Sequence, residues 1–262
     1  MTGDWTVVVG VKQVPDEDDV SIDPDTGTLN RAEAAAILNP PDRNALEAAL
    51  RLKDEVDAEV IAFTMGPPTA TPVLQVAVAL GCDDAVLISD YAFAGSDTWP
   101  TSLTLARVAE HFDADVVVCG EETTDSSTGQ VPPGIAAHLD WAQLTYVEEL
   151  EPVPEDDQLI ATRDVEGGYE RVVADLPVVV AIGYGENDPR PAGLHRNIFA
   201  ETEFEPLELD AEGLGIDPDE VGLDASPTQV GGMDTIEPVD REREVFDSVG
   251  DLATTLLEEG VV

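Results

Sequence analysis

The sequence DVVVCGEETTDSSTGQVPPG, residues 115–134, connects an apolar run to a polar loop and then to the start of a helix. The run Asp115–Cys119 has the valine content of a strand that is buried on both faces. The loop behind it is rich in serine, threonine and glycine, and a helix is expected to begin near Val131. A strand, a polar loop and a helix in this order are typical of α/β proteins.

Three apolar runs of the same kind come earlier in the chain, at Thr6–Val11, Glu59–Thr64 and Ala85–Ser89. Helical stretches separate these runs, and the alternation predicts a mostly parallel, doubly wound sheet with helices on both faces. The predicted helices are Asn44–Val56, which follows proline and cap signals, Val73–Leu80, which ends at Gly81, and Thr98–Phe112, which follows the cap residue Asp97.

The pattern changes after Trp141, where strand-like pieces and a turn at Glu166–Gly168 lead into the run Pro177–Ile182. These pieces predict an antiparallel addition to the sheet. A small hairpin is expected near the N-terminus, with Val20–Ile22 and Thr28–Asn30 on either side of a turn. The pieces of the antiparallel addition are Thr145–Leu150, Leu159–Val165 and Glu170–Ala174.

We predict two parts of the chain. Residues 1–200 are expected to form the α/β core. Residues 201–262 are expected to form an acidic extended linker, rich in proline and glycine as far as Asp240, followed by a C-terminal helix over Glu242–Glu259. That helix has apolar residues at helical spacing, so it is expected to dock on another surface.

The charge of the chain is its strongest compositional feature. Twelve basic residues stand against 56 acidic residues and give a formal net charge of −44. Molar salt shortens the Debye length to about 3 Å and removes most of the self-repulsion, so we interpret the acidity as adaptation to a very salty interior. The acidic residues are spread through periodic segments, unlike those of a disordered acidic tail. Without a basic patch to neutralise phosphates, DNA and RNA are poor partners.

Other compositional features point to a cytoplasmic location. The longest apolar runs are too short to span a membrane, and the N-terminus has no secretory signal pattern. The two cysteines, Cys82 and Cys119, fit a reducing compartment. The three histidines are scattered, and the acidic run 16–19 is interpreted as solvated surface, so no metal site is predicted.

Ligands of open α/β sheets bind beyond the carboxyl ends of the strands, so the loops after Val11, Thr64 and Cys119 form the candidate site. The loop after Cys119 brings hydroxyl groups and a glycine to a helix start, where free N–H groups can hold a phosphate. The loop Met65–Pro68 and the segment Asn39–Asp42 are expected at the same edge, where they could bracket a purine. Each feature taken alone also fits an ordinary turn or helix cap.

Several catalytic motifs are missing from the sequence. It has no G-x-G-x-x-G after the first strand, no G-x-x-x-x-G-K-[ST] and no nucleophile elbow, which weighs against ordinary dehydrogenases and ATPases. A universal-stress-type nucleotide regulator would carry a G-x-x-G-x(9)-G-[ST] loop, which this sequence lacks. A hydrolase that cleaves the α-phosphate of ATP would carry S-G-G-x-D-S where Lys12–Pro15 stands.

Five motifs occur in one order between residue 5 and about residue 200. They are Val11–Asp16, Leu38–Pro40, Met65–Pro67, Asp125–Val131 with Thr128-Gly129-Gln130, and Asp188–Arg190. In this combination the chain resembles the β subunit of electron transfer flavoprotein, the FixA type included. The aspartate loop with its Thr-Gly-Gln sequence, followed by a helix, is the most specific part of the resemblance.

The resemblance implies a sheet of the adenine-nucleotide α-hydrolase-like type and a heterodimer. An α subunit would hold most of the redox FAD, while this β chain would bind a structural AMP and have no catalytic site of its own. The C-terminal helix would then pack on the partner subunit. The nucleotide site implied by the resemblance consists of Gly10, Asn39, Pro40, Pro41, Asp42, Met65, Asp125, Ser126, Ser127, Thr128, Gly129, Gln130, Val131, Pro132 and Pro133.

Two further residues receive roles from the resemblance. Arg163 resembles an arginine that the β subunit extends toward the flavin, where a cation stabilises the anionic reduced form. Leu194, at the end of the segment Asp188–Leu194, resembles the leucine that docks partner dehydrogenases. The implied function is therefore to carry electrons from acyl-CoA or other flavin dehydrogenases toward a membrane quinone reductase.

Departures from the family pattern keep alternatives open. Thr128–Gln130 matches AMP-binding members, whereas Val131–Pro133 is closer to the FixA style, in which a second FAD can replace AMP and bifurcate electrons. Glu201–Glu205 stands where many relatives have lysines, and this difference fits either salt adaptation or a changed partner. Glu17 replaces a tyrosine that some members place near the flavin. A universal-stress-type regulator is the alternative from another class.

Overall fold

The computed structural model describes residues 5–16, 21–22, 29–30, 35–185, 187–229, 245–246 and 248–260. The chain divides into two units, residues 1–229 and residues 230–262, which are treated separately below. Within the described residues no helix combines the length and the apolar character that crossing a membrane requires.

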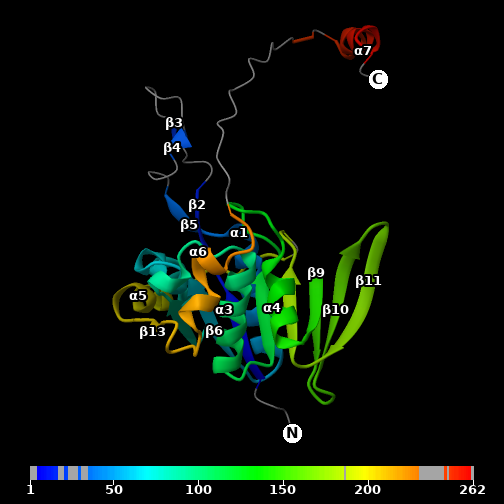
Figure 1. Cartoon of the computed structure of the whole chain (residues 1–262). Coiled ribbons are helices and arrows are strands. Elements are labelled where there is room, and N and C mark those ends of the chain that lie inside the picture. The colour runs from blue at the N-terminus through cyan, green and yellow to red at the C-terminus, as the bar shows by residue number, and fades with distance from the viewer. Residues whose placement is uncertain are drawn as a thin grey trace. The chain divides into compact units, whose positions relative to one another are not determined.

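A nine-stranded sheet forms the centre of the first unit, in the order β11-β10-β9-β12-β8-β1-β6-β7-β13 (Figure 1). All neighbours from β9 to β13 in that order run parallel, while β10 pairs antiparallel with both β9 and β11. The predicted parallel sheet with an antiparallel addition is therefore confirmed. The strands are β1 Trp5–Gly10, β6 Ala58–Met65, β7 Asp84–Ile88, β8 Val116–Gly120, β9 Ala142–Val153, β10 Gln158–Val165, β11 Gly168–Asp175, β12 Val178–Ile182 and β13 Leu207–Leu209.

Helices cover both faces of this sheet because successive strand residues point to opposite sides. Val7 and Val9 of β1 pack in the core beneath α1 and α2, whereas Val8 packs in the core beneath α3 and α4. In Figure 1, α3 and α4 lie on the near side of the sheet. The helices are α1 Pro40–Glu55, α2 Thr71–Leu80, α3 Thr98–His111, α4 Val131–Leu139 and α5 Leu194–Thr202, with short turns η2 Pro68–Ala70 and η3 Tyr91–Phe93.

The order of strands reverses beside β1. The chain runs outward from β1 to β6 and β7 and then returns to place β8 on the other side of β1. Connections on the two sides of such a point leave the sheet in opposite directions, and ligands of open α/β sheets bind there. We call the region at the carboxyl ends of β1 and β8 the crevice. The loops after β1 and β8, which carry the motifs singled out in the sequence, lie at this crevice.

Strand β9 lies between β12 and β10 and contains an irregularity in its pairing with both. Its pairing shifts register against both neighbours, between Val180 and Ile182 on β12 and between Thr162 and Arg163 on β10. Tyr146 has a φ of 56°, in the left-handed region that a tyrosine rarely adopts. Bulges of this kind change the direction in which nearby side chains point.

Two small antiparallel ribbons follow β1. Strands β2 Gln13–Pro15 and β5 Ala36–Leu38 pair with each other, as do β3 Ser21–Ile22 and β4 Leu29–Asn30. The second ribbon is the predicted hairpin. The predicted turn, Asp23–Gly27, lies outside the described residues, as do Val20 and Thr28 at the outer and inner ends of the predicted strands.

The predicted boundary at residue 200 is wrong, because the core continues to Gln229. Strand β13 pairs in parallel register with β7, and Ala211, Leu214 and Ile216 join the buried cluster under α3. The short helices η4 Pro218–Glu220 and α6 Gly222–Ala225 follow, and the Ser226 hydroxyl accepts the Asp97 N–H at 2.9 Å. The apolar residues here are spaced irregularly among acidic ones, so their burial was not evident from periodicity.

The second unit contains one described helix, α7 Val249–Glu258, within the predicted span 242–259. The Ser248 hydroxyl caps it by accepting the Asp251 N–H at 3.2 Å. Residues 230–244 and 247 lie outside the described residues, so the linker and the first turn expected there stay predictions.

Helices α3 and α4 approach each other closely where Gly134 faces Ser102. A Cβ atom on Gly134 would overlap the side chain of Ser102, whose hydroxyl donates to the Thr98 carbonyl at 2.6 Å. Gly134→Ala is expected to lower the free energy of unfolding by about 1–3 kcal/mol, because it overpacks this contact.

Chemical denaturation in molar salt measures the effect. Ser102→Gly removes the opposing side chain, so the double variant should be less destabilised than the sum of the single variants. Additive single effects would contradict a direct contact between these two positions.

Candidate functional site

Asn39, which is fully buried, connects the two loops at the crevice with the start of α1. Its backbone N–H donates to the Lys12 carbonyl at 2.9 Å, after β1. Its side-chain amide donates to the Glu122 carbonyl at 3.0 Å and accepts the Thr124 N–H at 3.2 Å, after β8. A single residue, through its backbone and its side chain, therefore holds three segments of the chain together.

Asp42 lies in the first turn of α1 and is also buried. Its carboxylate accepts the Lys12 N–H at 2.8 Å. Burial raises the pKa of Asp42 from 3.8 to about 7, although hydrogen bonds from Asn39, Lys12 and Gly120 lower it. The carboxyl therefore changes its charge near neutral pH.

Two glycines line the base of the crevice. A Cβ on Gly120 would overlap Asp42, and a Cβ on Gly10 would press against Phe63 and Cys119 at 3.2–3.3 Å. The absence of a side chain at Gly120 lets α1 approach the carboxyl end of β8, and its absence at Gly10 leaves room for Phe63 and Cys119 on the neighbouring strands. Burial raises the pKa of the Cys119 thiol to about 12, so this cysteine is an unreactive part of the wall.

An ion pair crosses the crevice between Lys12 and Asp125. The Lys12 Nζ lies 2.7 and 2.8 Å from the two carboxylate oxygens of Asp125. The Thr123 hydroxyl donates to the same carboxylate at 2.7 Å and lies 2.8 Å from the Ser126 hydroxyl. Although burial raises the pKa of Asp125, the hydrogen bonds from Lys12 and Thr123 outweigh it and hold that pKa below its ordinary value.

The loop before α4 turns through two left-handed residues, Ser127 at φ 45° and Gly129 at φ 60°. Helix α4 then begins at Val131, as expected from the sequence. Its second and third residues, Pro132 and Pro133, have no N–H, so this helix start offers fewer donors than most. N–H groups for an anion must therefore come mainly from the loop itself.

The predicted site residues fall into one group and one outlier. Gly10, the segment 39–42 and the segment 125–133 meet at the crevice, with Pro40 and Pro41 in the first turn of α1. Met65 ends β6, which lies beside β1. The Gln13 side chain connects the segment after β1 to the loop after β6 by donating to the Thr69 carbonyl at 3.0 Å. Arg163 stands apart on β10.

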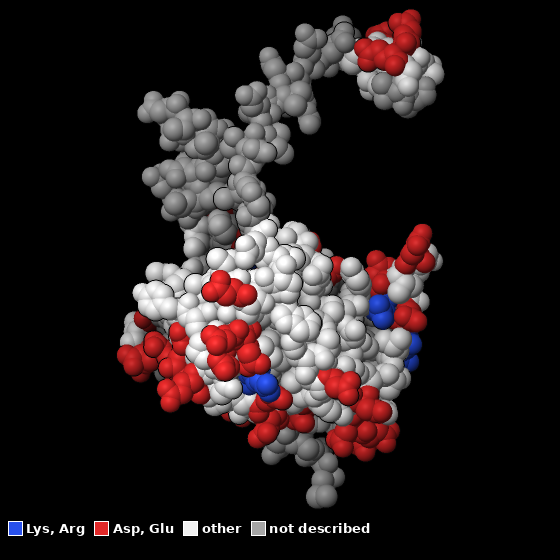
Figure 2. All heavy atoms as spheres, in the orientation of Figure 1, with Lys and Arg blue, Asp and Glu red and all other residues white. Residues whose placement is uncertain are grey.

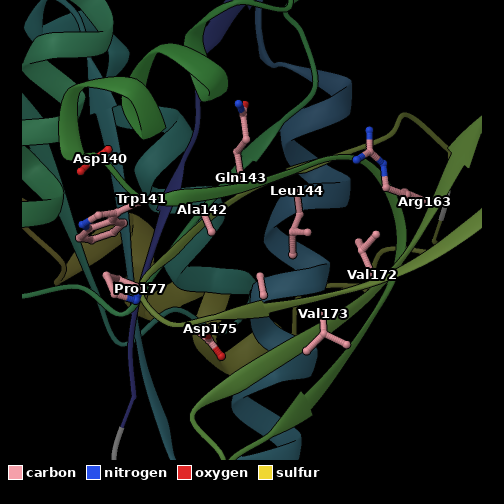
Figure 3. A pocket seen from close by; sticks show the side chains of 11 residues that line it. Asp140, Trp141, Ala142, Gln143, Leu144, Arg163, Val172, Val173, Asp175 and Pro177 are labelled. Carbon is pink, nitrogen blue, oxygen red and sulfur yellow. The ribbon is translucent and has the colours of Figure 1, made fainter.

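Arg163 and Gln143 both line two hollows. The first, about 340 Å³, also includes Gly129, Pro133 and Tyr146, so it adjoins the loop before α4. The second, about 530 Å³, continues over Trp141 and Val173 (Figure 3). One Arg163 Nη donates to the Thr145 hydroxyl at 3.3 Å, while its buried Nε has no hydrogen-bond partner among the described residues and lies 3.8 Å from Glu170.

The segment before Leu194 is held against α1. The Arg190 Nε and backbone N–H reach one oxygen of Glu47 at 2.8 and 3.0 Å, and an Arg190 Nη reaches Asp54 at 2.8 Å. Although burial raises the pKa of Glu47, hydrogen bonds from Arg190 and Arg51 hold it below its ordinary value. Leu194 itself begins α5 and is 78% exposed.

Sequence reasoning missed two of these features. Lys12 has no role in the predicted site, yet it is one of two lysines in the chain and closely follows the first predicted strand, a signal that could have identified it. The contact between Arg190 and Glu47 joins residues that are 143 positions apart, and no local pattern indicates it.

Comparisons with known proteins agree with these motifs. Residues 26–206 match the family described as "Electron transfer flavoprotein domain". The "Electron transfer flavoprotein subunit beta" of Thermoanaerobacterium thermosaccharolyticum is 40% identical over 240 residues, which cover 92% of this chain and 91% of the relative.

Two other relatives are similarly close. The "Caffeyl-CoA reductase-Etf complex subunit CarD" of Acetobacterium woodii is 43% identical over 86% of this chain and 85% of its own. The "Protein FixA" of Azotobacter vinelandii is 38% identical over 92% of this chain and 88% of its own.

The raised pKa of Asp42 makes stability depend on pH. Between about pH 4 and pH 7 the folded chain keeps the Asp42 proton, whereas the unfolded chain has released it. The contribution of Asp42 to the free energy of unfolding is therefore complete below about pH 4 and is lost as pH rises to about 7. The free energy of unfolding of the wild type relative to Asp42→Asn is expected to fall by on the order of 4 kcal/mol across this window.

Guanidinium unfolding at a series of pH values measures this difference. Asp113→Asn, at an exposed position near the amino end of β8, is the matched control and should keep the wild-type profile. Parallel profiles for the wild type and Asp42→Asn would show that Asp42 does not hold the proton.

Proposed function

The chain belongs to the electron transfer flavoprotein family, among the β subunits that include FixA, and from this premise we propose that it is the β subunit of a heterodimeric electron carrier. An α subunit holds most of a redox FAD, and the pair carries electrons from soluble flavin dehydrogenases toward a membrane quinone reductase. The carrier works in a salty cytoplasm and has no catalytic site of its own. Membership in this family removes the universal-stress-type regulator as an alternative.

The proposed ligand of the crevice is an adenine nucleotide, in the first instance AMP. The observation that carries this proposal is the joining of Asn39, Asp42 and both loops at the reversal of strand order, over a base of glycines. Lys12 supplies positive charge for a phosphate, Asp125 orients that ammonium group, and loop N–H groups donate. The adenosine packs against Gly10, the segment 39–42 and Met65.

Arg163 is proposed to face the flavin of the partner subunit. FAD supplies the redox chemistry, and the guanidinium places positive charge at the hollow shared with Gly129 and Tyr146. The buried Nε of Arg163 lies 3.8 Å from Glu170 without a hydrogen-bond partner among the described residues, and one Nη donates to Thr145 at 3.3 Å.

A second candidate is an electron-bifurcating subunit of the FixA type, in which a second FAD takes the place of AMP. The sequence Val131–Pro133 and the similarity to a FixA protein favour it. The two candidates share the crevice and differ in what fills it.

Cofactor extraction tests these proposals. After co-purification with an α subunit in molar salt, one FAD and one AMP per heterodimer are expected. Asp125→Ala should weaken AMP retention roughly 10- to 100-fold, because Lys12 loses the carboxylate that orients it.

Glu122→Ala is the control in the same loop, since only its carbonyl contacts Asn39. Two FAD per heterodimer would select the bifurcating candidate. A complex that contains no adenine compound besides the flavin of the α subunit would contradict the nucleotide proposal.

The segment Asp188–Leu194 is proposed to dock the electron-donating dehydrogenase through Leu194. The Arg190 contacts with Glu47 and Asp54 hold this segment in place while Leu194 remains exposed. In the second unit, α7 exposes Val249 and Leu257 and is proposed to pack on the α subunit.

Stopped-flow reduction of the carrier by an acyl-CoA dehydrogenase tests the docking role. Leu194→Ala should slow donor-dependent flavin reduction by about tenfold or more, with FAD content unchanged, because an apolar anchor is lost. Leu223→Ala removes another exposed leucine and is the control. Equal rates for Leu194→Ala and the wild type would remove Leu194 from docking.

A further inference from the structure

One face of the first unit has no charged side chains. It consists of residues 98–106 of α3, residues 126–139 before and along α4, and residues 141–147 of β9; we call it the uncharged face. Twenty of these positions are exposed or half-buried, and none is aspartate, glutamate, lysine or arginine. Figure 2 shows this broad area over α3 and α4 with acidic side chains gathered around it.

This absence is unusual for the chain. Charged residues make up 26% of the sequence and occupy most other exposed segments. A surface that meets water in molar salt gains from carboxylates, whereas the centre of a protein interface is depleted of charge and enriched in aromatic residues. Two large aromatic side chains are exposed on the uncharged face, Trp99 at 55% and Tyr146 at 53%.

The three segments of the uncharged face form one continuous surface. Trp99 packs against His138 with ring centroids 4.5 Å apart, which joins α3 to α4. Gly129 and Pro133 line the same hollow as Gln143 and Tyr146, which joins the start of α4 to β9. The twenty positions compare with the roughly 20–30 residues that each side contributes to a stable interface.

We propose that the flavin-holding α subunit covers the uncharged face. This inference deepens the proposed function and rests on it, because it assigns the heterodimer contact to a particular surface. A partner there would close the hollow beside Arg163 and the loop before α4, so it would bring its own cofactor to the residues proposed to face it.

Other occupants fit less well. A second copy of this chain in a two-fold arrangement would bring the acidic border, with Asp97, Asp125 and Asp140, toward its own equivalent. The proposed dehydrogenase contact, Leu194 on α5, belongs to the other side of the sheet, because α5 packs on α2 and α2 covers the face opposite α3 and α4. The uncharged face is thus free for the α subunit.

Charge insertion tests the proposal. Trp99→Glu and Ala137→Glu place a carboxylate on the uncharged face, at positions that are already exposed. Each is expected to weaken the heterodimer at least about 100-fold, because a carboxylate buried without a partner is strongly unfavourable. Tagged β chain and untagged α subunit are co-expressed, and the recovered α subunit is measured in molar salt.

Tyr91→Glu is the matched control. Tyr91 is 99% exposed and lies beside Asp219 and Asp224, in a region that already carries acidic side chains. This variant should recover the α subunit as well as the wild type does. Circular dichroism and thermal unfolding of each β chain in molar salt show whether a variant has lost its fold.

A measurement on the unmodified protein keeps the proposal testable if a variant fails to fold. Hydroxyl-radical labelling is read by mass spectrometry at Trp99, Tyr146 and Tyr91, in the free β chain and in the heterodimer. Protection of Trp99 and Tyr146 with unchanged labelling of Tyr91 is expected.

The outcomes separate this inference from the proposed function. A wild-type β chain that recovers no α subunit contradicts the heterodimer itself. A heterodimer that survives both charge insertions and leaves Trp99 labelled overturns only the assignment of the face. Protection that rises with β-chain concentration alone, or only on addition of a dehydrogenase, assigns the face to that other occupant and also overturns the proposal.

Discussion

The buried amide of Asn39 is the contact on which the crevice depends. It reaches the loop after β1 through its backbone and the loop after β8 through its side chain. An unpaired buried amide costs about 1–3 kcal/mol, so packing of α1 on the sheet requires both loops to stay in place. The shape of the crevice therefore follows from core packing and does not wait for a ligand.

Helix α1 extends the same constraint to the segment before α5. Asn44 donates to the Asn187 carbonyl at 2.8 Å, and Glu47 holds Arg190, one and two turns beyond the residues that close the crevice. Buried polar groups on the inner face of a helix are stable only while their partners remain. The proposed nucleotide site and the proposed docking segment thus both depend on the first half of one helix, and neither can shift without disturbing α1.

The sequence predicted the parts of the fold that depend on local pattern. Valine runs and helical spacing located the strands, the crossover helices and the antiparallel addition, because burial on one or two faces leaves a period in the sequence. The position of β13 was not predictable, since Leu207–Leu209 owes its place to pairing with β7, far away in the chain. The same distinction applies to single residues. Asp125 could be predicted because it lies within a glycine- and serine-rich loop, whereas Glu47 could not, because its role depends on a partner that is distant in the chain.

The distribution of charge explains why Lys12 matters in so acidic a chain. One of only two lysines lies at the reversal of strand order, while the other, Lys53, pairs with Asp83. Pro132 and Pro133 deprive α4 of N–H donors, so the proposed phosphate would depend on the nearby cation as well as on the helix start. In the partly buried crevice an ion pair is less screened by salt than on the surface. A lysine retained at this place therefore keeps its electrostatic effect under conditions that weaken most other charges of the molecule.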